Sequence, residues 1–173
     1  MAVALALCGA LLAGTTACGS SDDDAGAEPS GSVTGTAERQ KFAKTRFVAN
    51  AGLAAGAAYQ WIIKPARDGK FKKGADGRKF TLVKAGLAGT FAYNRLKAAA
   101  KNAEGDPLLA KAVAPLMAGI DSLKELPSKL RKGEGADAAA GVFDDVINSV
   151  KDAGNDAGAP VKDKVPSLSQ LGG

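Results

Sequence analysis

The sequence predicts an all-α protein whose folded part is a four-helix bundle-like domain. Apolar residues recur at three- and four-residue spacing along most of the 173-residue chain, which is typical of helices packed on a core. Proline and glycine separate these stretches at positions where helices commonly begin or end. No segment rich in β-branched residues competes with this interpretation. We expect the helical domain to cover residues 37–160 and an extended tail to cover residues 161–173.

The first helix is expected over residues 37–64, because Pro65 should stop it. Residues 47–63 carry no charge, which is typical of a helix buried in a protein core or a membrane. A membrane span needs about 20 apolar residues. This run is shorter and contains Asn50 and Gln60, so we expect it to lie in a protein core.

A loop is expected over residues 65–78, with turns at Asp68-Gly69 and Asp76-Gly77. A small hairpin over residues 70–80 is an alternative, although few β-branched residues support it. The second helix should follow over residues 79–103 and end before the next glycine.

The third helix should begin at Asp106-Pro107, since aspartate is a good N-cap and proline suits the first helical turn. Pro115 lies inside its apolar pattern and should kink or split it. Pro127 should end the apolar stripe or start another turn that runs through Leu130.

The fourth helix is expected over residues 137–153, after a Gly133-Glu134-Gly135 linker. Its predicted apolar face consists of Ala139, Val142, Phe143, Val146, Ile147 and Val150. The tail after Gly158 is expected to pack three apolar side chains onto the bundle, namely Val161, Val165 and Leu168.

A short internal repeat relates the first two helices: residues 51–60 resemble residues 85–94. Both copies place small residues four apart, at Gly52 and Gly56 and at Gly86 and Thr90. Small residues on one face let two helix backbones approach closely. We therefore expect the two helices to pair antiparallel along this face, with the edges filled by Tyr59, Trp61, Phe91 and Tyr93.

The chain has two cysteines, Cys8 and Cys18, and no histidine. With Cys8 removed in a signal peptide and Cys18 modified, the composition excludes a disulfide scaffold and cysteine or histidine nucleophiles. It also excludes thiolate or imidazole metal sites and histidine-based pH switching. No catalytic or nucleotide-binding motif is present, so an enzyme is the least favoured class, and we expect no metal and no cofactor.

Apolar residues 2–13 precede a run of small residues that ends at Cys18, followed by Ser and Asp. This pattern resembles a bacterial lipoprotein signal peptide over residues 1–17, with Cys18 as the lipid-modified residue. An ordinary secreted protein cut after Ala17 is the alternative. The segment before the apolar run lacks Lys and Arg, which suggests that the true start lies upstream of Met1. Residues 18–36 are expected to form a disordered tether.

Three segments of the body are distinctive: residues 46–61, Phe91-Ala92-Tyr93-Asn94-Arg95-Leu96 and Lys164-Val165-Pro166-Ser167-Leu168. In these segments the body resembles small uncharacterised helical lipoproteins and secreted proteins of Streptomyces-like actinobacteria. The resemblance implies an extracytoplasmic protein that is lipid-anchored to the cell membrane. It implies no activity and no site residue beyond Cys18.

The net charge of +5 is concentrated between Lys64 and Lys84, where only Asp68 and Asp76 oppose the basic residues. Such a segment would attract anionic lipid or a cell-wall polymer, while nucleic acid is not an expected partner. A solvated loop that only aids solubility is the alternative. The candidate contact residues are Lys64, Arg67, Lys70, Lys72, Lys73, Arg78 and Lys79.

Two function classes therefore remain. The first is a non-catalytic, lipid-anchored binding protein of the cell envelope that uses the basic segment as its contact surface. The second is a carrier of a lipophilic small molecule, with a pocket between helices lined by Tyr59, Trp61 and Tyr93. These aromatic residues are equally compatible with a role in the core and at its edge.

Overall fold

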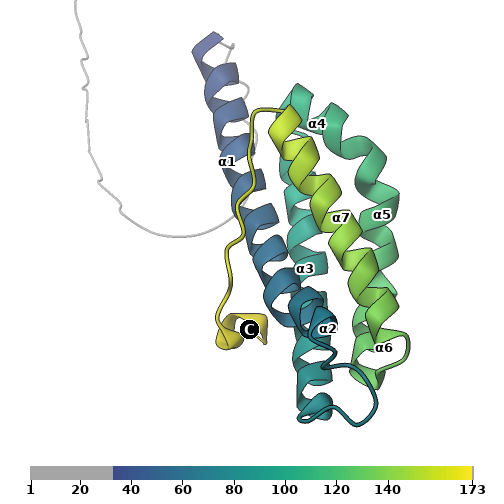
Figure 1. The fold of residues 1–173 in the computed structure, drawn as a ribbon. Helices are drawn as coiled ribbons and strands as arrows, with labels where there is room; N and C mark the ends of the chain where they lie inside the picture. The colour runs from purple at the N-terminus through teal and green to yellow at the C-terminus, as the bar shows by residue number, and fades with distance from the viewer. Residues whose placement is uncertain (1–32, 173) are drawn as a thin grey trace, which may run out of the picture. The chain divides into compact units, whose positions relative to one another are not determined.

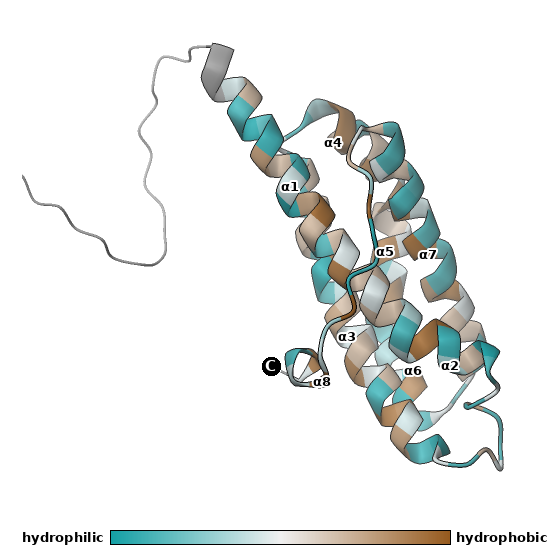
Figure 2. Cartoon of the chain, turned by 60° about the vertical axis from the view of Figure 1, so that its left-hand side comes forward, coloured by the Kyte–Doolittle hydropathy of each residue, from teal (hydrophilic) through white to brown (hydrophobic). Residues whose placement is uncertain are grey.

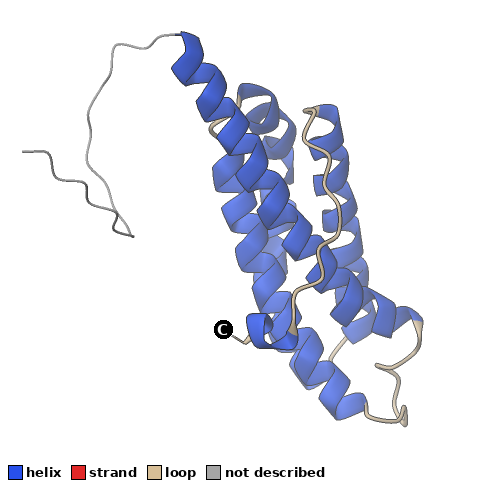
Figure 3. Cartoon of the chain, turned by 90° about the vertical axis from the view of Figure 1, so that its left-hand side faces the viewer, coloured by secondary structure: helices blue, strands red, loops and turns tan. Residues whose placement is uncertain are grey.

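The computed structural model describes residues 33–172 of the chain. These residues form helices, turns and one extended segment, and no strand occurs among them (Figure 3). The predicted all-α class is confirmed, whereas the hairpin over residues 70–80 is wrong. The expected signal peptide, Cys18 and most of the expected tether lie outside the described residues. The first helix already begins at Val33, before the expected start at Ala37.

Four antiparallel helical segments pack side by side (Figure 1). The first comprises α1 (Val33–Ala58), the π-helical turn η1 (Tyr59–Ile63) and α2 (Lys64–Arg67). The chain then turns through residues 68–77 and returns along α3 (Arg78–Ala103). The third segment is built from short pieces: α4 (Pro107–Val113), η2 (Ala114–Leu116), α5 (Met117–Ser122), η3 (Leu123–Glu125) and α6 (Leu126–Lys132). The fourth is α7 (Ala136–Asp156).

The expectation that Pro65 stops the first helix is wrong, because helical backbone continues to Arg67. The π-helical turn η1 comes directly before the proline, and the Lys64 N–H donates to the Tyr59 carbonyl five residues back. Pro65 then falls in the first turn of α2, where its missing N–H leaves no bond unmade. The wider turn thus accommodates the proline within the helical segment.

Pro115 and Pro127 behave as predicted. Pro115 falls in the first turn of η2 and Pro127 in the first turn of α6, so each splits the third segment. Asp106 caps α4, where one carboxylate oxygen accepts hydrogen bonds from the Leu108 N–H at 3.1 Å and the Leu109 N–H at 2.9 Å.

The core combines many alanines with a few large side chains. Alanines of α1 and α3 are buried along the length of both helices, so the two backbones can lie close together. Phe47, Leu96, Leu109 and Phe143 are among the largest fully buried side chains. On α7, Val142 departs from the predicted apolar face, since it is 37% exposed.

The C-terminal residues form a strap, which we define as the extended segment 159–167 together with α8 (Leu168–Leu171). The strap leaves the end of α7, runs beside α1 and ends against α3 (Figures 1 and 2). The Lys164 N–H donates to the Gly52 carbonyl of α1 at 2.8 Å. Val161 is partly buried as expected, but Val165 is 56% and Leu168 46% exposed. Leu171 is the buried anchor instead.

The predicted glycine seam between the first two helices is wrong, although the helices do pair antiparallel. Gly52 and Gly56 face the strap: a Cβ on Gly52 would lie 2.6 Å from the Lys162 carbonyl oxygen, and one on Gly56 would overlap the Lys164 carbonyl. Gly86 faces the Arg131 side chain of α6. The glycines of α1 therefore make room for an extended backbone, and alanines form the contact with α3.

Candidate functional site

The basic segment lies at one end of the bundle, where α2, the loop 68–77 and the start of α3 meet (Figure 1). We call residues 64–84 the basic end. Its loop is predominantly hydrophilic, as the colouring in Figure 2 shows. Six of the predicted contact residues are exposed there: Lys64, Arg67, Lys70, Lys72, Lys73 and Lys79.

Arg78 is the exception, because it holds the loop in place. Its Nε donates to the Phe71 carbonyl at 2.7 Å, and its Nη2 donates to the Gly133 carbonyl at 3.4 Å. Phe71 itself is buried in the core. The loop is thus fixed from both sides, by an apolar anchor and by a guanidinium that links it to the α6–α7 turn.

The exposed cations of the basic end divide into two groups. Lys64 pairs with Asp68 at 3.4 Å and Arg67 pairs with Asp144 at 2.6 Å, so nearby carboxylates partly neutralise both. The second group has no ion pair within residues 33–172 and consists of Lys70, Lys72, Lys73 and Lys79. These four ammonium groups give the basic end its positive field.

A cavity of about 320 Å³ opens at the basic end between η1, the loop and the first turns of α3. Its lining includes Trp61, three ammonium groups and two carboxylates, contributed by Lys64, Lys70, Lys84, Asp68 and Asp76. The Lys84 Nζ lies 5.3 Å from the centre of the Trp61 ring and 4.0 Å from the centre of the Phe80 ring. Both contacts are favourable cation–π interactions.

The three aromatic residues predicted to line one pocket are separated. Trp61 lines the cavity just described, while Tyr59 is 42% exposed and Tyr93 is half-buried, and neither lines that cavity. Lys84 belongs to the cavity but was not among the predicted contact residues. Its place in the basic run was a signal for it, but only the fold brings it over Trp61.

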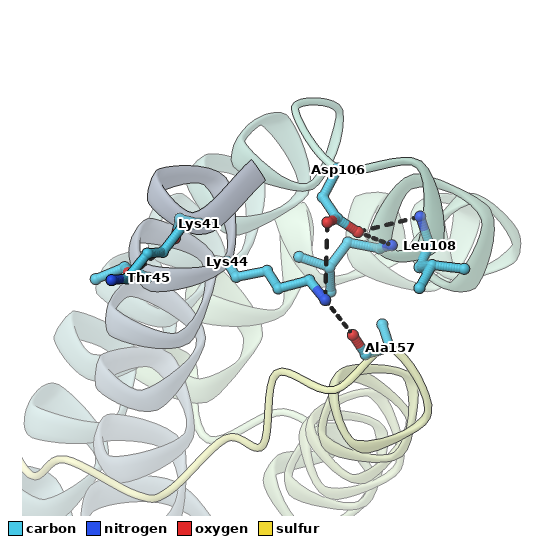
Figure 4. A network of polar contacts seen from close by, with 7 residues as sticks. Lys41, Lys44, Thr45, Asp106, Leu108 and Ala157 are labelled. Atoms are coloured by element: carbon cyan, nitrogen blue, oxygen red, sulfur yellow. Dashed lines mark hydrogen bonds and ion pairs between the residues drawn. The ribbon is translucent and has the colours of Figure 1, made fainter. Parts of the chain in front are cut away.

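The opposite end of the bundle carries a partly buried ionic contact (Figure 4). Asp106 is 3% exposed, and its second carboxylate oxygen lies 3.7 Å from the Lys44 Nζ. The same ammonium donates to the Ala157 carbonyl at 2.8 Å. Lys44 of α1 therefore connects the N-cap of α4 to the C-terminal end of α7. Every polar group in this network has a structural partner, so we assign it to stability.

Two kinds of feature are absent from the described part of the chain. Within residues 33–172, no three Cys, Asp or Glu side chains are grouped so that they could hold a metal ion. None of the helices over the same residues combines the length and apolar character needed to span a bilayer.

Comparison with known proteins gives no relative. No protein-family model matches the chain, and no curated protein or solved structure shows significant similarity to it.

Proposed function

We propose that this protein is a non-catalytic, lipid-anchored binding protein of the cell envelope whose basic end binds an anionic polymer. The observation that carries the proposal is the set of four exposed lysines without an ion-pair partner over residues 33–172: Lys70, Lys72, Lys73 and Lys79. A chain of closely spaced negative charges would contact several of them at once.

The fixed shape of the loop supports a binding role. Phe71 is buried and Arg78 holds two carbonyl groups, so the loop backbone between them is tied to the bundle. A surface that is ordered before its partner arrives loses less conformational entropy on binding. The lysines on this loop are therefore presented together at little further cost.

The position of the basic end favours a polymer over the bilayer surface. The loop lies at one end of α3 and Val33 lies near the other, and α3 has 26 residues, which at about 1.5 Å per residue is about 40 Å. With a lipid anchor on the N-terminal side of α1, the basic end lies at the end of the bundle remote from the anchored terminus, which favours a partner outside the bilayer.

The test uses a variant with all four lysines changed to glutamine and a matched control. The control changes four exposed lysines elsewhere, Lys41, Lys101, Lys111 and Lys124. Both have the same net charge, so only the location of the charge differs. We call the variant with the four basic-end lysines changed to glutamine the loop variant. We expect the unmodified protein and the control to be retained on immobilised long-chain polyphosphate at low salt, and the loop variant to pass through without being retained.

Retention should also fall steeply as salt rises, since exposed charges are screened. Equal retention of the loop variant and the control would overturn the proposal, as would retention that does not depend on salt. Binding to phosphatidylglycerol vesicles without binding to polyphosphate would assign the surface to the membrane and would also overturn the polymer proposal.

A further inference from the structure

We infer that the cavity at Trp61 binds one phosphate-bearing polyol or sugar unit, the repeat of the polymer that the basic end contacts. The inference deepens the proposed function and rests on it for the source of the ligand. The chemistry of the cavity itself is independent of that source.

The charge of the cavity favours an anion. Lys64, Lys70 and Lys84 contribute three ammonium groups against the two carboxylates of Asp68 and Asp76. Only Lys64 is paired with one of these carboxylates, at 3.4 Å between two exposed side chains. A phosphate group offers several acceptor oxygens and can pair with more than one ammonium group at once.

The rest of the lining suits the carbon skeleton of such a unit. The Trp61 ring supplies an apolar surface, and Gln60 and Thr81 supply neutral groups that can donate to or accept from hydroxyls. The volume of about 320 Å³ admits a ligand of a few carbon atoms with one phosphate. A purely lipophilic ligand would cover the ammonium and carboxylate groups without pairing them, which is unfavourable.

Lys84 is held in position before any ligand arrives. Its Nζ lies over both the Trp61 and the Phe80 rings, so the ammonium is kept beside the apolar surface. The phosphate of a ligand in the cavity would therefore meet a cation already in place. Lys70 lines the cavity and also belongs to the exposed loop, so a polymer lying along the loop can place one unit in the cavity.

Trp61 is the chain's single tryptophan, so its fluorescence reports on this cavity. We would titrate the protein with glycerol 3-phosphate and, as the uncharged match, with glycerol. We expect a saturable change with glycerol 3-phosphate and none with glycerol. Lys70→Gln, which leaves both aromatic rings and Lys84 in place, should weaken binding about tenfold, since it removes one contact to a charged group. Lys124→Gln, an exposed lysine outside both this cavity and the basic end, should leave the affinity within about twofold.

Calorimetric titration of Lys84→Met gives a second measurement that does not depend on the tryptophan signal. Its affinity should also fall about tenfold, with an unchanged melting transition as proof of folding. The absence of saturation with glycerol 3-phosphate, an equal response to glycerol, or an equal effect of Lys124→Gln would overturn the inference.

The inference and the proposed function can fail separately. Retention on polyphosphate without any response to glycerol 3-phosphate overturns the cavity site alone. Saturable glycerol 3-phosphate binding without retention on polyphosphate overturns the proposed function alone. Phosphatidylglycerol vesicles distinguish a lipid headgroup as the source: a change in Trp61 fluorescence with vesicles but not with free glycerol 3-phosphate also overturns the inference.

Discussion

Substituting Gly56 by alanine tests whether the strap, and not α3, is the reason for glycine on this face of α1. The added Cβ would overlap the Lys164 carbonyl and would lie 2.6 Å from the Val165 nitrogen. Both are backbone atoms that cannot rotate away. The strap must therefore shift away from α1 around this residue.

The expected loss follows from the contacts that hold the strap. The hydrogen bond from Lys164 to Gly52 contributes about 1 kcal/mol, and burial of Leu171 contributes about 1.5–3 kcal/mol. The ion pair between Lys151 and Asp163, at 2.6 Å and partly exposed, adds at most about 1 kcal/mol. Alanine recovers about 0.5–1 kcal/mol as the better helix former. We expect a net destabilisation of about 1.5–4.5 kcal/mol if the strap is largely displaced.

Urea denaturation measures this loss, and Gly141→Ala is the matched control. Gly141 is also a helical glycine, but a Cβ there meets nothing within 4 Å, so alanine should stabilise the protein by about 0.5–1 kcal/mol. In a chain that ends at Gly158, Gly56→Ala should also become neutral or stabilising, because the obstructing backbone is gone. An equal destabilisation in the full and the shortened chain would refute the reasoning and place the close contact elsewhere.

Three further predictions follow from single contacts. Asp106→Ala should lower the free energy of unfolding by about 1–2 kcal/mol, measured by thermal denaturation, because α4 loses its N-cap. Arg78→Met should speed amide hydrogen exchange in the loop near Phe71, while exchange in the middle of α3 stays unchanged. The hydrogen bond to Asp121 raises the pKa of Lys97 above 10.5, so NMR titration should show that pKa falling in Asp121→Asn. The small stabilisation from this pair is present below the ordinary pKa and is lost as pH rises through the raised one.

The sequence predicted the helical segments well where local signals determine them. The bounds of α3 and the start of α4 follow from a glycine turn, a glycine after the helix and an Asp-Pro pair, whose effects need no distant partner. Pro65 was misjudged because the π-helical turn before it is a backbone adjustment with no compositional signal. Gly52 and Gly56 indicated correctly that something approaches α1 closely, but small residues do not specify what approaches.

The candidate site was also predicted only in part, because local sequence signals determine some of its features and tertiary packing determines the others. Clustering of lysines in sequence places them near one another in a loop, and the structure exposes most of them together. The Arg78 side chain points inward because it donates to the carbonyls of Phe71 and Gly133, and Gly133 is far away in sequence. The proximity of Lys84 to Trp61 depends on how α3 packs against η1, which periodicity alone cannot give.

The strap also affects the order in which the parts of the fold form. Its residues follow all four helical segments along the chain, yet their partner is the first helix of the described chain, so this contact has a large sequence separation and forms late. Until the strap around Lys164 has packed on α1, the glycine face of α1 remains uncovered. A chain interrupted between Asp156 and Lys164 would keep all four helical segments and still leave this face of α1 uncovered, by which a protease could distinguish it from a chain that carries the strap.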